Sequence, residues 1–258
     1  MFPLIVASTL MAAGMISNLD NDFVGHTSHK IYLKPDFFWG LPTSDQLYDE
    51  ESESYISKKI SRPFYKGIDL SYEWEKPNSL YFSAQWTNSI ASVKKTLTSS
   101  LGETRSYDLE QSFSNIEARV GRSFQQEGTS LAMVPYVALG RYGGSDTCFV
   151  EGERYEENVD VLYAALGNKL MFHFGKIFDI GVNLKLMRPV YVHLEDPFME
   201  ASLKINEIIA LGYEAAAPIV CHLADGAWEI QLEPYLLKLN TNDANRFVGG
   251  RLAIGHCF

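Results

Sequence analysis

The feature that most constrains the fold is an alternation of apolar and polar residues with a period of two, which recurs in separate segments along the whole chain. In residues 66–75 it is uninterrupted, with one face made of Ile68, Leu70, Tyr72 and Trp74 and the other of Asp69, Ser71 and Glu73. Because successive side chains of a strand point to opposite faces, each such segment predicts a β-strand. The predicted strands cover residues 30–40, 66–75, 80–87, 112–124, 130–142, 160–174, 178–190, 203–217, 228–239 and 247–258.

The connections between these strands alternate in length. Short turns, such as KPNS at 76–79 and residues 175–177, alternate with long polar segments at 41–64, 90–110 and 143–158. In an up-and-down antiparallel array, consecutive connections lie at opposite ends, so all the short turns fall at one end. The sequence therefore predicts an all-β fold, a ten-stranded antiparallel up-and-down barrel, with its long loops together at the other end.

Alternation alone leaves open which face of the barrel is outside. A soluble lipocalin-like barrel that binds an apolar ligand turns its apolar face inward, whereas a transmembrane barrel turns it outward, and a composition of 46% hydrophobic and 21% charged residues suits both. In the transmembrane case the polar rows bring charges of both signs into the lumen: Asp69, Glu73, Glu117, Arg119, Lys169, Lys185, Glu229, Glu233 and Arg251. A barrel of this size is nearly filled by side chains, so we expect these charges to plug it. The alternative is a narrow channel for small solutes.

The stretch at 247–258, FVGGRLAIGHCF, places Leu252, Ile254, His256 and Phe258 on one row. It resembles the closing strand of Gram-negative outer-membrane barrels, in which a terminal Phe is the hallmark of the assembly signal. Those proteins often have an aromatic residue third from the end, where this chain has His256. Together with the connection lengths, the resemblance is to small outer-membrane proteins of the OmpA-like or opacity-adhesin type, over residues 30–258.

This resemblance implies a location in the bacterial outer membrane, with both termini on the periplasmic side. It also implies outer-membrane lipid and the barrel-assembly machinery as partners, and a role in surface adhesion or a structural role. A host or extracellular ligand would bind through the loops at 41–64, 90–110 and 143–158.

The domain organisation follows from the first residues. Met1–Ser17 is apolar and ends in small residues, which predicts a signal peptide cleaved near Ala13 or Gly14, although no Lys or Arg precedes the apolar run. A buried first helix or strand is the alternative. Residues 18–29 are then a polar linker and residues 30–258 a single barrel domain.

Aromatic and cysteine residues give further expectations. Interfacial girdles of a membrane barrel are rich in Trp and Tyr, and we assign to them Trp39, Trp74, Trp86, Tyr213 and Trp228. Cys221 and Cys257 would both lie at the periplasmic mouth, where a disulfide is chemically permitted. The three cysteines lack metal-ligand spacing, so neither a metal nor a cofactor is expected. A net charge of -10 argues against a nucleic-acid partner.

Candidate catalytic residues are few. His193, Glu195 and Asp196 resemble the Asp and His that ten-stranded proteases of the omptin family carry at their loop-side rim. The paired Asp motif of that family is missing from the earlier loops. The sequence therefore predicts that the protein is not an enzyme, with a rim-located hydrolase as the alternative.

Overall fold

The computed structural model describes residues 28–40, 44–49, 54–60, 63–98, 104–125, 129–150, 153–195, 211–239 and 246–258. The predicted signal peptide at 1–17 and most of the predicted linker lie outside these residues. The described elements are strands, apart from the single 3-10 turn η2 (Ala224–Gly226). None of the helical structure described here has the length and apolar character needed to cross a membrane.

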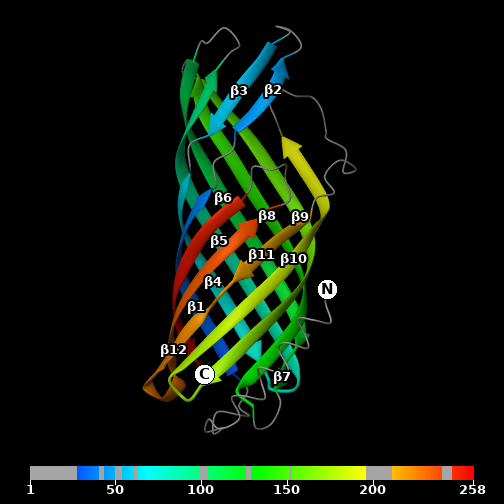
Figure 1. The fold of residues 1–258 in the computed structure, drawn as a ribbon, viewed down its shortest axis with the longest axis vertical. Helices are drawn as coiled ribbons and strands as arrows, with labels where there is room; N and C mark the ends of the chain where they lie inside the picture. The colour runs from blue at the N-terminus through cyan, green and yellow to red at the C-terminus, as the bar shows by residue number, and fades with distance from the viewer. Residues whose placement is uncertain are drawn as a thin grey trace.

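The strands form a closed antiparallel barrel (Figure 1). In order around the wall they are β1 (Ser28–Gly40), β4 (Phe64–Glu75), β5 (Leu80–Thr98), β6 (Thr104–Arg122), β8 (Leu131–Val150), β9 (Glu153–Phe174), β10 (Phe178–Glu195), β11 (Gly212–Ala216) with β12 (Ile219–Leu223), β13 (Trp228–Lys238) and β14 (Arg246–Cys257). Strand β14 pairs with β1 along its length and closes the ring. With β11 and β12 taken as one interrupted strand, the predicted ten-stranded barrel is confirmed.

Short turns gather at one end of the barrel, which we call the turn end. Asn78 in the turn after β4 has a φ of 53°, and Gly175 in the turn after β9 has a φ of 66°. Asn and Gly tolerate this left-handed conformation better than other residues, so both turns can be tight. The long connections leave from the opposite end, which we call the loop end.

Five strands are much longer than the sequence predicted. Strands β5 and β6 have 19 residues each, β8 has 20, β9 has 22 and β10 has 18, whereas about 9 to 11 residues cross a bilayer. A hairpin of β2 (Ser44–Asp49) and β3 (Ser54–Ile60) pairs with the upper edge of β5, at Lys95–Thr98. The predicted loops at 41–64, 90–110 and 143–158 are therefore largely β-structure, a correction to the sequence analysis.

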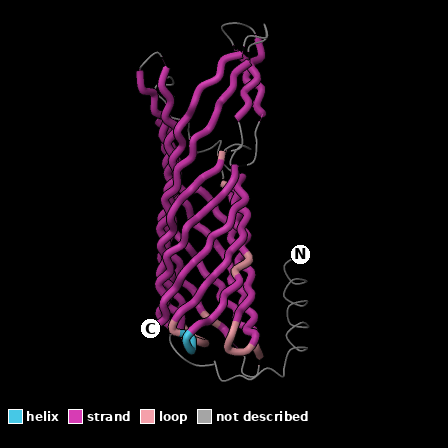
Figure 2. The backbone as a smooth tube through the Cα atoms, turned by 90° about the vertical axis from the view of Figure 1, so that its left-hand side faces the viewer, coloured by secondary structure: helices cyan, strands magenta, loops and turns pink. Residues whose placement is uncertain are grey.

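These long strands rise on one side of the barrel. Figure 2 shows them continuing beyond the level at which the remaining strands end. We call β5, β6, β8, β9 and β10, with the β2–β3 hairpin, the raised wall, and β11, β13, β14, β1 and β4 the low wall. Above the membrane the pattern is inverted, because apolar residues such as Val93 and Leu109 are buried while Ser92 and Glu110 face water, so these strands were missed.

The eighth strand is also displaced from its predicted position. It was expected at 203–217, yet the described part runs from Gly212 to Leu223, and the chain turns only at Ala224–Ala227. Pro218 suggested a turn because it has no N–H group for the ladder. The strand passes through it nonetheless: the Ala217 N–H donates to the Pro234 carbonyl at 2.9 Å, and the Gly181 N–H to the Pro218 carbonyl at 2.7 Å.

Apolar rows of the barrel face outward. Leu139 is 70% exposed and Leu166 67%, and exposed Leu, Ile, Val, Phe and Trp side chains recur on every long strand. Their neighbours in sequence are buried, as in β14, where Leu252 is exposed and Arg251 buried. An apolar exterior around a polar interior is the arrangement of a membrane barrel, and it is the opposite of what a soluble lipocalin-like barrel requires.

Candidate functional site: the barrel lumen

A chain of ion pairs crosses the lumen near its middle. Glu117 on β6 accepts hydrogen bonds from Arg119 Nε at 2.5 Å and from Lys185 Nζ at 2.8 Å. Since β6 and β10 are separated by β8 and β9 along the wall, the second bond spans the interior. Lys185 Nζ also lies 2.5 Å from the Glu214 carboxylate on β11. The chain thus links one side of the barrel to the other.

Arg251 on β14 continues this chain. Its Nη1 donates to Glu233 at 2.7 Å and to Glu214 at 3.3 Å, and its Nε lies 3.7 Å from Asp36 on β1. The guanidinium also lies over the Tyr235 ring, 4.1 Å from its centroid. We call Glu117, Arg119, Lys185, Glu214 and Arg251, with Asp36 and Glu233, the central ion network. All seven are buried.

A second group of charges lies nearer the turn end. Glu229 on β13 accepts hydrogen bonds from Lys30 Nζ at 2.7 Å and from the Tyr32 hydroxyl at 2.5 Å. His222 Nε2 and His173 Nδ1 each lie 2.9 Å from an oxygen of Asp179. These contacts connect β1, β9, β10, β12 and β13 around the mouth of the barrel.

A further ion pair joins Lys169 Nζ to Glu73 at 2.8 Å. The remaining predicted lumen residue, Asp69, is buried on β4 and accepts a hydrogen bond from Thr87 Oγ1 at 2.8 Å. The structure thus places all nine predicted lumen charges inside the barrel. Lys34, Asp36 and Glu214 are buried beside them.

A cavity of about 950 Å³ occupies the turn half of the lumen. Charged side chains of both signs line it, among them Lys30, Glu73, Lys169, Asp179 and Glu229. The central ion network forms its upper limit, because Arg119, Glu214, Glu233 and Arg251 also border it. Beyond the network the next cavity holds only about 20 Å³. The lumen is therefore open in its turn half and filled at its centre.

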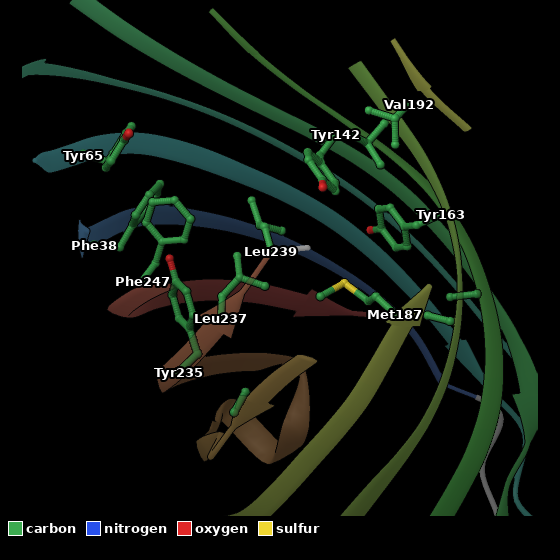
Figure 3. Close-up of a cluster of buried hydrophobic side chains, with 14 of the residues drawn as sticks. Phe38, Tyr65, Tyr142, Tyr163, Met187, Val192, Tyr235, Leu237, Leu239 and Phe247 are labelled. Carbon is green, nitrogen blue, oxygen red and sulfur yellow. The ribbon is translucent and has the colours of Figure 1, made fainter. Parts of the chain in front are cut away.

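The loop half of the lumen is apolar, which the sequence analysis did not foresee. Figure 3 shows these side chains converging from strands around the barrel. They include Phe38, Tyr65, Tyr142, Tyr163, Met187, Val192, Tyr235, Leu237, Leu239 and Phe247, all of them buried. Phe38 stacks on Tyr65 with 4.5 Å between ring centroids, and Phe247 meets Phe38 edge-on at 5.4 Å. This apolar cluster closes the lumen above the ions.

Interior tyrosines were also missed, although their place on the polar rows was the available signal. Tyr163 donates to Glu117 at 2.6 Å and Tyr136 donates to Asn183 at 2.8 Å. Each ring covers a glycine on the neighbouring strand. A Cβ added to Gly167 would come within 2.2 Å of Tyr136, and one added to Gly140 within 2.3 Å of Tyr163. These glycines make room for the rings that complete the ion network.

The predicted girdle residues occupy different levels. Trp39 is exposed near the loop end of β1, and Trp228 is exposed at the turn end, where β13 begins. Trp74 lies near the turn end of β4, and Tyr213 near the loop end of β11. Trp86 lies part-way up β5, between Leu70 and Ile116 on the adjacent strands. Four of the five thus lie near strand ends, as a girdle requires, and Trp86 lies within the apolar belt.

The row of the terminal strand points away from the lumen. Leu252, Ile254 and Phe258 are 48%, 58% and 63% exposed, and His256 lies on the same face. Ile254 lies opposite Leu33 of β1 and Ile230 of β13. The row thus continues the apolar exterior across the closing seam. Its reading by assembly machinery stays a prediction.

The predicted disulfide between Cys221 and Cys257 is absent, since both thiols are free. Cys221 lies within β12 and shares the outward face of Ile219, whereas Cys257 lines the cavity. Strand β13 separates β12 from β14, so two strand spacings of about 4.8 Å each keep the backbones apart. Bridged Cα atoms must lie within about 7 Å. The prediction failed because it placed Cys221 in a turn.

The rim residue His193 is exposed on β10, opposite Asp160, and stacks on Tyr191 with 6.5 Å between ring centroids. Asp196 lies outside the described residues, and the side chain of Glu195 does too. In the described part of the chain, His, Cys, Asp and Glu form no group of three or more arranged to hold a metal ion.

Comparisons with known proteins come from solved structures alone. No family model matches the sequence, and no curated protein matches it. The translocator domain of the autotransporter NalP from Neisseria meningitidis is similar at a TM-score of 0.48 and 10% identity, covering 98% of this chain and 97% of that one. The outer-membrane protease OmpT from Escherichia coli is similar at a TM-score of 0.48 and 9% identity, covering 91% and 98%.

The attachment invasion locus protein Ail of Yersinia pestis is similar at a TM-score of 0.38 and 10% identity, covering 90% of this chain and 99% of that one. At such identities the likeness is one of architecture. The closed wall leaves no strand edge in the bilayer, and the exterior is apolar, as spanning a membrane with strands requires. The chain therefore has the fold of a transmembrane β-barrel.

Proposed function

We propose that the protein acts at the cell surface by binding an extracellular partner through its raised wall, while its lumen stays closed. The observation that carries this proposal is the filled lumen. The central ion network and the apolar cluster above it fill the lumen between the level of Glu117 and the level of Phe38. A pathway for bulk transport would have to displace both.

The raised wall supplies the surface for binding. Strand β9 has 22 residues, about twice what the bilayer needs, so at about 3.3 Å per residue it projects roughly 30 Å further. Above the apolar belt the outward face of β6 is polar, with exposed Ser106, Asp108, Glu110 and Ser114. Cross-strand hydroxyl contacts support it, such as Ser112 to Ser145 at 2.8 Å. A hydrated, regular β-surface of this size suits protein or glycan binding better than lipid contact.

A narrow channel is the second candidate, because the turn half of the lumen already holds a cavity of about 950 Å³. Only the ion network and the apolar cluster separate it from the loop end. Conduction would need these groups to separate, and both hold the wall together from inside. We therefore place the channel behind the binding role.

Conductance in planar bilayers distinguishes the two candidates. We expect the purified protein, inserted at neutral pH in about 1 M KCl, to show no sustained open level. Folding is established beforehand by heat-modifiable migration on gels. A stable, salt-dependent open level would overturn the closed lumen and favour the channel.

Adhesion is tested by shortening the raised wall. Val93 and Leu109 lie opposite each other on β5 and β6, so residues 94–108 can be replaced by Asn-Gly, which forms a two-residue hairpin turn. Cells that display this variant should lose binding to matrix-coated surfaces or host cells, while the barrel still folds. The matched control carries an equally sized insertion in the turn at 175–177. Equal binding by the shortened variant would contradict a role for the wall.

A further inference from the structure

Outward-facing cations lie just above the apolar belt on the nearby strands β10, β13 and β14. Arg188 follows Leu186 on β10, Lys238 follows Leu236 on β13, and Arg246 precedes Val248 on β14. In each case the apolar and the basic residue alternate onto the same outward face. We call Arg188, Lys238 and Arg246 the cationic rim. Arg188 and Arg246 are exposed and Lys238 is half-buried.

The strand register brings these residues side by side. Leu186 lies opposite Tyr213, Tyr213 opposite Lys238, and Lys238 opposite Arg246. Directly opposed side chains of an antiparallel pair have Cβ atoms about 4.5 to 5.5 Å apart, and like charges there are destabilising. The Lys238–Arg246 pair therefore calls for a negative charge between its members.

No described carboxylate supplies that charge on the low wall. The buried carboxylates of its strands point into the lumen, as shown by Asp36, Asp69, Glu214, Glu229 and Glu233. Elsewhere the barrel neutralises an outward cation within its own wall: Arg141 on β8 holds Asp160 through two hydrogen bonds of 2.7 Å. The rim cations have no such carboxylate partner among the described residues, in a chain whose net charge is -10.

The surroundings of the rim identify the missing anion. Below it lie exposed apolar side chains, including Leu186 at 51% and Val248 at 44%. Tyr213, next to Lys238, offers a phenol of the kind that occupies the lipid head-group level. A phosphorylated lipid has a matching arrangement, with its phosphate above its acyl chains. Clustered Lys and Arg beside a membrane bind anionic head groups, at about 1 kcal/mol for each charge.

We propose that the cationic rim is a binding site for a phosphorylated lipid of the loop-side leaflet. Lys238 and Arg246 hold one phosphate between them, Arg188 reaches the same head group from across Tyr213, and the acyl chains lie on the Leu186, Leu236 and Val248 row. In an outer membrane the loop-side lipid of this chemistry is the phosphorylated glycolipid lipid A. The site lies at the level of the membrane surface, below the projecting part of the raised wall, and does not depend on what that part binds.

The test measures lipid A binding to the folded protein in detergent micelles by native mass spectrometry. The probes are bisphosphorylated lipid A and the same lipid after enzymatic removal of its phosphates. Wild type should prefer the phosphorylated form. Because each charge accounts for about a fivefold change in affinity, K238Q/R246Q should bind it about twenty-fivefold more weakly. The matched control R122Q/K176Q removes two cations at the turn end and should stay within about twofold of wild type.

Several results would overturn the site. Unchanged lipid A binding by K238Q/R246Q would do so, as would equal binding of the dephosphorylated lipid, or inorganic phosphate competing as well as the lipid. If K238Q/R246Q fails to show heat-modifiable migration, the single variant R188Q takes its place, with an expected loss of about fivefold. No loss in R188Q would likewise count against the proposal.

Discussion

His256 and Trp228 meet edge to face on the outer surface, with 4.7 Å between their ring centroids and 77° between their planes. They lie opposite each other on β14 and β13, and the His256 ring also stacks at 6.0 Å on Phe258. The imidazole thus supplies an aromatic ring at the third position from the end of the sequence. It joins the last strand to its neighbour by ring packing.

This pair predicts how position 256 tolerates change. His256→Phe should leave stability unchanged, because it keeps an aromatic ring against Trp228, whereas His256→Ala should cost about 1 kcal/mol, the usual worth of such a ring pair. Urea titration of the folded band on unheated gels measures both. If the alanine and phenylalanine variants unfold at the same urea concentration, the ring contact contributes nothing.

Replacing Lys185 tests how much the central ion network stabilises the barrel. Lys185→Met leaves the buried carboxylates of Glu117 and Glu214 without a shared cation, and losing one partner of a buried pair costs about 3 to 5 kcal/mol. The double variant K185M/E214Q should recover part of that loss, because it also removes one stranded charge. Lys176→Met, in the exposed turn, is the control. A K185M protein as stable as wild type would contradict the network's role in holding the barrel together.

Replacing Arg251 is expected to open the lumen and to make it selective for cations. It contacts Asp36, Glu214 and Glu233 at once, so Arg251→Ala leaves three carboxylates facing a widened centre. We expect brief open events that prefer K⁺ over Cl⁻, measured from the reversal potential in a salt gradient. Arg122→Ala, which removes an outward cation at the turn end, should stay silent. Anion preference in the Arg251 variant would show that these carboxylates do not line the path.

The cysteines predict a simple chemical result. Cys221 and Cys257 point to opposite sides of the wall, so protein purified without reductant should migrate identically with and without it. In a Cys148→Ser background, unfolding in the presence of a maleimide should label two thiols per chain, as counted by mass spectrometry. A species with neither thiol available would show that the strands had moved.

Sequence alone predicted the membrane part of the fold well. In β4 and β14 lipid on one side and ions on the other impose opposite demands on neighbouring residues, and the alternation records both. Above the membrane the demand is reversed: Val93 and Leu109 are buried, whereas Ser92, Ser106 and Ser114 face water. The outward polar residues made β5 and β6 resemble a polar loop. The eighth strand was predicted in the wrong position because Pro218 was read as the start of a turn. A strand can lack one N–H hydrogen bond of its ladder and still continue.

The sequence predicted which charged residues face the lumen, but it did not predict which of them contact one another. Charges on polar rows had to face inward, yet nothing in the alternation says that Lys185 reaches Glu117 across the lumen, since that contact depends on barrel width and strand shear. The apolar cluster was missed for a related reason. Phe38 and Phe247 lie on rows that are polar nearer the turn end, and only their height in the barrel groups them together.

The reciprocal placement of Tyr136 over Gly167 and Tyr163 over Gly140 has a consequence for assembly. A slip of the β8–β9 hairpin by two residues would preserve which side chains face lipid, so hydrophobicity alone would not reject it. In one direction the slip sets Tyr136 against Ala165 and Tyr163 against Ala138, and neither ring then has a bare backbone to lie on. The two glycines therefore favour the native register of the hairpin over a two-residue shift, which contact with lipid alone would allow.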